Sequence, residues 1–305
     1  MPNQSLGSMF PSFFGAVIYG AAPLTIAAMG GILSERSGVV NIALEGLMLF
    51  GAFAAVWAET AFSHRGVGAF PAAILGLLAA VLAGALLGLL HAFLTQRTRM
   101  DHVVSGLGIN LLAAGATRYL YLFLYPTGVS VSGLPRSFFV GLAVVLPFIV
   151  LWALWRTRFG LRLRAVGENP ESALMAGISP GISRYAAVTL SGVLAAVAGA
   201  YLSLADSHTF ASDISAGKGY IALAAVIFGK WNPLGAAGGA LFFGFFYALQ
   251  TQLQISNVHL RLLGVEWSSP FLLDTLPYIM TIMALVSVVG KAAPPAALGR
   301  ATEES

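Results

Sequence analysis

The chain contains no cysteine and little charge. The absence of Cys from its 305 residues excludes a disulfide framework and a thiolate metal site. Charged residues make up 9% of the sequence and hydrophobic residues 58%, whereas a soluble domain carries about 25% charge. This composition indicates a protein of the lipid bilayer.

Several functional motifs are also missing. The Gly-Lys pairs at 217–218, 229–230 and 290–291 are not followed by Ser or Thr, so none completes a phosphate-binding P-loop. Neither Gly-x-Ser-x-Gly nor His-Glu-x-x-His occurs, which argues against a hydrolase or a zinc protease. Asp206, His208 and Asp213 share one loop without a metal-ligand spacing, so no metal site is predicted. Energy for any pumping would have to come from another subunit.

The arginines behind the net charge of +4 are confined to particular loops and form no basic stripe for a nucleic acid. They serve better as a topology signal. Because cytoplasmic loops are enriched in Lys and Arg, we expect two loops inside the cell. The first carries Arg97 and Arg99, and the second carries the four arginines Arg156, Arg158, Arg162 and Arg164.

Long apolar runs predict an all-α polytopic membrane protein. Runs of 18 or more mostly apolar residues suggest about nine transmembrane helices, with eight to ten as the range. They lie at 10–33, 39–58, 69–94, 103–124, 138–155, 182–204, 215–230, 235–254 and 274–290. Run 215–230 is short and rich in glycine, so it either spans the membrane or is re-entrant.

This count sets the remaining topology. Nine spans place both arginine loops inside, the loop 125–137 outside, the N-terminus outside and the C-terminus inside. Residues 1–291 would form one transmembrane domain. Residues 292–305, rich in Ala and Pro, are expected to be a disordered tail.

Small residues recur four apart in several spans, where they allow helix backbones to approach closely in lipid. The pairs are Gly84 with Gly88, Gly192 with Ala196, and Gly235 with Gly239. They predict a tightly packed bundle and say nothing about a solute.

The polar stretch 156–182 has the pattern of a short capped helix. Asn169 suits the N-cap and Pro170 the first helical position, with Glu171 in the first turn, where the helix dipole favours an anion. Gly177 is placed to end the helix, and Pro180 prevents it from resuming. A two-turn helix is unstable alone in water. It therefore packs either on its own protein's membrane face or on a cytoplasmic partner, and the residues leave both readings open.

Polar residues inside the second span need partners. Asn41 and Glu45 are four apart and would share one helix face. Glu45 is the one carboxylate expected well inside a span, at a cost of about 2.5–3.5 kcal/mol. It would either clamp helices together, with Asn110 of the fourth span as a partner, or line a translocation path. The other polar groups in the spans are neutral, which suits a neutral hydrogen-bonding solute better than an ion.

Three segments carry a resemblance to a known family. Residues 33–46 end in Gly-Val-Val-Asn-Ile-Ala-Leu-Glu-Gly, residues 171–177 read Glu-Ser-Ala-Leu-Met-Ala-Gly, and residues 217–233 read Gly-Lys-Gly-Tyr-Ile-Ala-Leu-Ala-Ala-Val-Ile-Phe-Gly-Lys-Trp-Asn-Pro. In this order they resemble the permease subunits of ATP-binding-cassette (ABC) importers for branched-chain amino acids, ribose and nucleosides, and are closest to the nucleoside and simple-sugar subgroup. Ser172 replaces an alanine of the family's Glu-Ala-Ala-x-x-x-Gly loop, a small-for-small change.

The resemblance implies a permease subunit of the bacterial inner membrane that imports nucleosides or related simple sugars. It also implies two cytoplasmic ABC ATPases, a second permease chain and an extracytoplasmic substrate-binding protein as partners. The chain itself would bind no cofactor, because ATP and Mg are used by the ATPase. The implied ATPase-coupling residues are Gly167, Glu168, Asn169, Pro170, Glu171, Ala173 and Gly177, and the implied path or supporting residues are Asn41, Glu45 and Asn110.

An alternative is a secondary transporter or channel that acts without an ATPase. Such proteins usually carry several buried ionisable groups for ion coupling. Glu45 is nearly alone in this respect, which disfavours the alternative.

Overall fold

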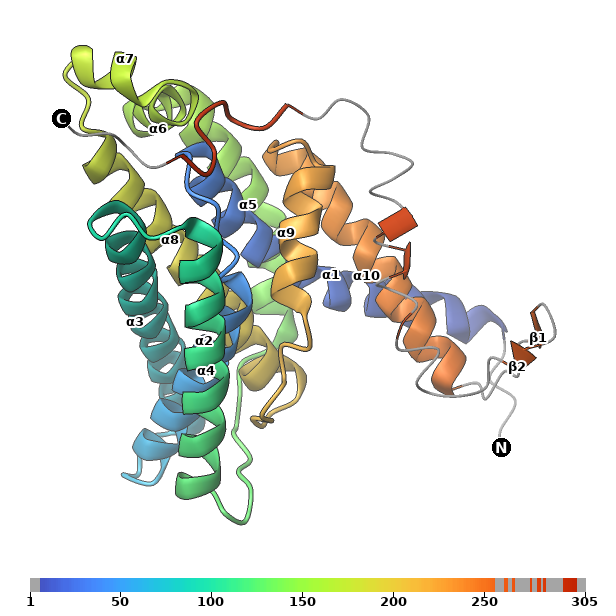
Figure 1. Ribbon diagram of the computed structural model, residues 1–305. Helices are drawn as coiled ribbons and strands as arrows, with labels where there is room; N and C mark the ends of the chain where they lie inside the picture. The colour runs from blue at the N-terminus through green and yellow to red at the C-terminus, as the bar shows by residue number, and fades with distance from the viewer. Residues whose placement is uncertain are drawn as a thin grey trace.

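A computed structural model gives the fold, a bundle of long helices (Figure 1). It describes residues 6–255, 261–262, 265–266, 275, 279–280, 282–283 and 293–300, with backbone alone for 6–12, 255 and the two strands. The elements are α1 (Leu6–Arg36), α2 (Leu44–Ser63), α3 (Ala69–Gln96), α4 (His102–Leu124), α5 (Arg136–Arg156), α6 (Arg158–Glu168), α7 (Pro170–Met175), α8 (Pro180–Ala200), the π-helix η1 (Tyr201–Asp206), α9 (Lys218–Phe228), α10 (Pro233–Ile255), β1 (Arg261–Leu262) and β2 (Val265–Glu266). The two strands form a two-residue antiparallel pairing.

Seven helices in the described part of the chain are long and apolar enough to cross a membrane. They fall at seven of the nine expected runs, so the all-α polytopic class is confirmed. Helix α9, at the run 215–230, has 11 residues and is about 16 Å long, roughly half the 30 Å of a bilayer core. This length fits the re-entrant reading. The ninth expected span, 274–290, lies almost entirely outside the described residues, and the count of nine stays a prediction.

Helices α1, α2 and α8 form the centre of the bundle, since two-thirds or more of the apolar part of each is buried, against a third or less for α3, α4, α5 and α10. Glycine permits the closest packing. A Cβ added at Gly84 of α3 would overlap the carbonyl of Gly192 on α8, and one added at Gly192 would overlap the carbonyl of Gly84. The small-residue pairs on these two helices therefore face each other, as expected for helices packed in lipid.

The two ends of the bundle differ. Helices α6 and α7 lie at the same end as the α3–α4 turn, so both arginine loops share one end, which we call the α7 end (Figure 1). The α4–α5 loop lies at the opposite, far end. It is only partly exposed, because Val131 and Leu134 are buried and their N–H groups donate to the carbonyls of His208 and Leu204.

The expected disordered tail is corrected for residues 293–300. They lie against the α7 end, where Ala297 is 3% exposed. Its N–H donates to the Gly167 carbonyl at 2.9 Å, and the Gly299 N–H donates to the Gly38 carbonyl at 2.9 Å. A segment rich in Ala and Pro looks unstructured in isolation, but backbone hydrogen bonds to glycine carbonyls need no side-chain signature.

Candidate functional site

The capped helix α7 has the predicted ends. The Asn169 side chain accepts from the Ser172 N–H at 2.9 Å, and Pro170 is the first helical residue. Gly177 is left-handed, with φ of +76°. Its N–H donates to Leu174, and the Ile178 N–H donates to Ala173, both at 2.9 Å. This pair of bonds is a Schellman motif, which glycine favours.

Helix α7 exposes two large apolar side chains at the end of the bundle. Met175 is 92% exposed and Leu174 is 51% exposed. Of the predicted coupling residues, Gly167 and Ala173 are buried and Pro170 is half-buried, whereas Glu168, Asn169, Glu171 and Gly177 are exposed. The exposed set can contact a partner and the buried set holds the element in place. Their role in coupling stays a prediction.

Helix α6 was not anticipated as a helix. Its arginines indicated topology, but Leu163 and Val166 are both buried, as expected for residues three apart on one helix face. Arg164 lies over the Trp155 ring at 4.0 Å and donates to the Leu154 carbonyl at 3.0 Å. These contacts attach α6, and α7 with it, to the end of α5.

A break separates α1 from α2 over residues 37–43, and this corrects the expected helix 39–58. The chain turns at Gly38, whose φ is +94°. Asn41 lies in the break, so it does not share a helix face with Glu45. Its side chain donates instead to the Ser191 hydroxyl of α8 at 2.7 Å.

The backbone of the break is satisfied by side chains of other elements. Arg184 donates to the Ser37 carbonyl at 3.1 Å and Asn110 donates to the Ile42 carbonyl at 2.9 Å. The Val40 N–H donates to His102 at 3.3 Å. Non-helical backbone within a membrane protein is tolerated only with such internal partners, so the break is a built feature of the bundle.

Glu45 joins two helix N-termini. It lies in the first turn of α2, and its carboxylate accepts from the Gly217 N–H at 2.8 Å and the Gly219 N–H at 2.6 Å, at the start of α9. Both helix dipoles favour an anion there. The clamp reading therefore has a structural basis, although the partner is α9 backbone. The expected partner, Asn110, accepts from the Gly46 N–H at 2.8 Å and donates to the Tyr220 hydroxyl at 2.9 Å.

Glu45 was expected to be the one carboxylate well inside a span, but two other acids are more deeply buried in the bundle. It is half-buried, whereas Glu35 and Glu59 are each 2% exposed. The Trp231 indole donates to Glu35, and the Ser132 N–H donates to Glu59 at 3.1 Å. Both acids lie just beyond the expected apolar runs 10–33 and 39–58.

A cavity of about 700 Å³, which we call the chamber, lies towards the far end. Its polar and aromatic lining comes from α1, the start of α5, η1, the start of α9 and α10, and consists of Tyr19, Arg136, Tyr201, Asp206, Lys218, Tyr247 and Thr251. The Lys218 ammonium lies 5.4 Å from the centre of the Tyr247 ring. Lys218 stands between the two glycines that hold Glu45, so the chamber adjoins the junction of α2 and α9.

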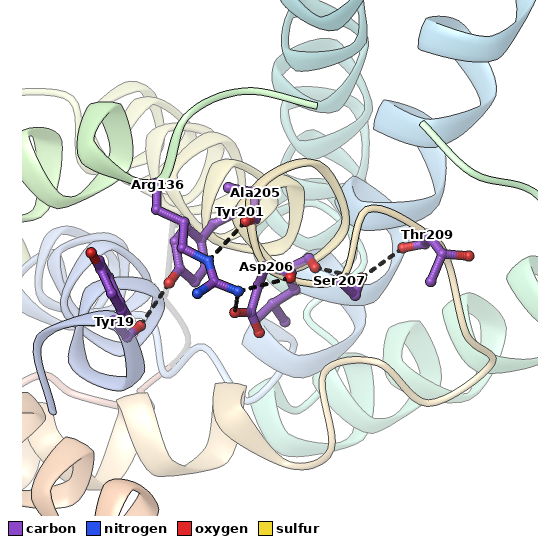
Figure 2. Close-up of polar contacts among 8 residues, drawn as sticks. Tyr19, Arg136, Tyr201, Ala205, Asp206, Ser207 and Thr209 are labelled. Atoms are coloured by element: carbon purple, nitrogen blue, oxygen red, sulfur yellow. Dashed lines mark hydrogen bonds and ion pairs between the residues drawn. The ribbon is translucent and has the colours of Figure 1, made fainter. Parts of the chain in front are cut away.

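Arg136 organises the wall of the chamber (Figure 2). It forms an ion pair with Asp206 at 3.0 Å and donates to the carbonyls of Ala205 and Asp206, each at 3.0 Å. These carbonyls belong to the last two residues of η1, where the end of a helix leaves backbone acceptors without an intrahelical donor. Tyr201 donates its hydroxyl to the Tyr19 carbonyl at 2.9 Å. The wall is thus tied to both α5 and α1.

Comparison with known proteins decides the family. The model of the branched-chain amino acid transport system / permease component family matches residues 13–285. The chain belongs to this permease family. It is 38% identical to the guanosine ABC transporter permease protein NupQ of Bacillus subtilis, over 93% of this chain and 94% of the relative. It is also 38% identical to the nucleoside ABC transporter permease protein NupC of Lactococcus lactis, over 92% of each chain.

A third relative has a different stated solute. The putative glucose ABC transporter permease protein TsgC13 of Haloferax volcanii is 32% identical over 91% of this chain and 92% of the relative. The permease is therefore an integral membrane transport subunit of an ABC system.

Several features of this permease could not be predicted from the sequence. The break, the chamber and the Arg136 cluster depend on residues from separate helices that are brought together only by folding. One signal was available: Arg136 is a lone arginine in a loop expected outside, where positive charge is uncommon. A structural partner such as Asp206 was a reasonable inference from it.

Proposed function

We propose that this permease imports nucleosides or related simple sugars across the bacterial cytoplasmic membrane, driven by separate ABC ATPase subunits that dock on α7. The observation that carries the proposal is the capped helix α7. It presents exposed Leu174 and Met175 at the end of the bundle that bears the arginine loops. An exposed apolar patch on a polar surface is typical of a protein contact.

The proposed partners would supply the functions that this chain lacks. The chain has no P-loop of its own, so ATP and Mg would be bound by the ATPase. A second, related permease chain would complete the pore, and an extracytoplasmic binding protein would deliver the solute to the far end. The family membership and the names of the relatives support this assembly.

Movement of α7 can reach the break through α6, which contacts the end of α1. A Cβ added at Gly167, near the end of α6, would overlap the carbonyl of Arg36, which is the last residue of α1. Displacement of α6 would therefore displace the end of α1 beside the break. Since Glu45 ties α2 to α9, and α9 borders the chamber, the proposed cycle opens the chamber alternately to the two sides.

The chamber suits a neutral, partly aromatic solute. Its 700 Å³ falls within the roughly 300–1,000 Å³ of small-molecule sites. Arg136 and Asp206 neutralise each other as an ion pair, and the remaining cation of the lining, Lys218, stands between the two glycines that bind the Glu45 carboxylate. Tyr19 and Tyr247 provide aromatic surface on which a nucleobase can stack.

The decisive experiment removes the docking element. In proteoliposomes holding the whole complex, we expect Gly177→Pro, or deletion of 169–177, to leave membrane insertion intact and to abolish ATP-dependent uptake of radiolabelled guanosine. Normal uptake by either variant would refute the coupling assignment. Uptake by the chain alone, with an ion gradient and no ATPase, would favour the secondary transporter instead.

The chamber has a separate test. Lys218→Gln removes the cation between Tyr247 and the Glu45 junction, and we expect the guanosine concentration for half-maximal uptake to rise. Lys230→Gln is the matched control, because Lys230 follows the other end of α9 and is exposed. Equal effects of the two substitutions would exclude Lys218 from the solute path.

A further inference from the structure

The C-terminal residues 293–300, which we call the strap, connect two parts of the molecule that the chain does not join directly. The Ala297 N–H donates to the Gly167 carbonyl in α6, and the Gly299 N–H donates to the Gly38 carbonyl in the break, both at 2.9 Å. The Ala296 N–H also lies 3.3 Å from a carboxylate oxygen of Glu168. One short segment thus bonds both the helix that leads into α7 and the backbone turn between α1 and α2.

Arg184 fixes the same junction from α8. Its side chain is fully buried. It donates from Nη1 to the Arg300 carbonyl at 3.2 Å and to the Gln96 side chain at 3.2 Å, and from Nε to the Ser37 carbonyl at 3.1 Å. The strap, the break and the ends of α3 and α8 therefore meet at one guanidinium group.

The strap has little slack. Pro294 and Pro295 restrict its first residues. Two turn bonds follow, from the Leu298 N–H to Pro295 at 3.0 Å and from the Arg300 N–H to Ala297 at 3.1 Å. A Cβ added at Gly38 would lie 3.1 Å from the Ala297 carbonyl oxygen. A segment this closely fitted transmits displacement better than a flexible tail.

We propose that the strap transmits the movement of α7 to the break during the ATP-driven cycle, an inference that rests on the proposed function. Helix α6 already contacts the end of α1 through Gly167 and Arg36. A single contact of this kind lets one element pivot on the other. The strap adds a second attachment at Gly38, beyond the end of α1, so that displacement of α6 turns the break instead of sliding past it.

The test compares two neighbouring alanines of the strap. Ala297 is buried and Ala296 is exposed, so Ala297→Leu should displace the strap and Ala296→Leu should not. Both variants are assembled with the ATPase, the second permease and the binding protein in proteoliposomes. ATP hydrolysis and guanosine uptake are then measured on the same vesicles. Since substitutions along coupling networks change coupling by amounts that correspond to roughly 2- to 30-fold, we expect uptake to fall within that range for Ala297→Leu while hydrolysis continues.

A pair of truncations gives a second measurement. A chain ending at residue 292 lacks the strap, whereas a chain ending at Arg300 keeps all of it. We expect the shorter chain to copurify with the ATPase and hydrolyse ATP without proportionate uptake, and the longer chain to behave as the full chain does.

The results separate a failure of the strap proposal from a failure of the proposed function. Unchanged uptake in Ala297→Leu and in the chain ending at residue 292 would overturn the proposal. A parallel fall of hydrolysis and uptake would also overturn it, because the strap would then merely support the docking surface. Failure of the unaltered complex to take up nucleosides or sugars with ATP would instead be a failure of the proposed function.

Discussion

Helix α7 and the break at residues 37–43 are both short elements in a bundle of long helices, but they are stabilised in opposite ways. The ends of α7 are satisfied by Asn169 and by the Gly177 turn, all within a few residues of chain. The break draws its partners from α1, α3, α4, α8 and the strap. A locally closed element keeps its shape when it moves as a unit. An element held from many sides responds whenever one of its neighbours is displaced.

The largest effect should come from the buried arginine at the break. Arg184→Met removes the donor from three acceptors, the buried carbonyl of Ser37 and the part-buried Gln96 side chain and Arg300 carbonyl. Because each unsatisfied group costs about 1–3 kcal/mol, we expect a loss of about 3 kcal/mol in the free energy of unfolding. Denaturant unfolding in detergent measures it. Arg162→Met, at an exposed position on α6, should change it by less than about 0.5 kcal/mol, and similar losses would contradict the contrast.

A smaller loss is expected at Asn110, which bonds the backbone on both sides of the start of α2. Asn110→Leu removes the bonds to Gly46, Ile42 and Tyr220, at a cost of about 2 kcal/mol. Tyr220→Phe removes only one of them, and single side-chain bonds between membrane helices average about 0.6 kcal/mol. Equal losses for the two variants would show that the hydroxyl, and not the backbone bonds, carries the contribution of Asn110.

The N-cap of α7 should have a local effect only. Asn169→Ala removes the cap and should destabilise the helix by about 1 kcal/mol. The unfolding free energy of the whole protein should stay unchanged, because the capping bonds of α7 are local and we expect it to open independently of the bundle. Amide hydrogen exchange over 170–177 is the measurement, with Ser172→Ala as the control that keeps the cap. A global loss of stability would mean that α7 is not a separate unit.

The smallest effect is expected at the end of the same helix. Gly177→Asn keeps a residue that tolerates the left-handed conformation, and should cost a few tenths of a kcal/mol. Gly177→Val places a β-branched side chain there and should cost more than Gly177→Asn, again seen in exchange over 170–177. If both variants exchange alike, the positive φ of Gly177 does not limit the stability of α7.

The same contrast explains what the sequence could predict. Asn169, Pro170 and Gly177 specify α7 by their own chemistry, so its limits were predicted to within a residue. The long apolar helices were predicted for the same reason, because their signal is local. The break was taken for helix because residues 39–58 form one long, mostly apolar run. Its actual partners, such as His102 and Arg184, lie 62 and 147 residues away from the atoms they bind.

The candidate site follows the same division. Glu45 was singled out because a carboxylate in an apolar run needs a partner, and that need is a local fact. The identity of the partner, the backbone of Gly217 and Gly219, leaves no mark in the side chains. The strap was missed for the same reason, since its bonds run between backbone atoms of Ala297, Gly299, Gly167 and Gly38.

Glu45 also imposes an order on biosynthesis. Its carboxylate cannot accept from the Gly217 N–H until that residue, 172 positions later in the chain, has been made. At about 5–20 residues per second, the ribosome needs roughly ten to thirty seconds to supply it. Until then the carboxylate on α2 lacks these two donors, and the junction is completed only when α9 reaches a carboxylate that was made long before it.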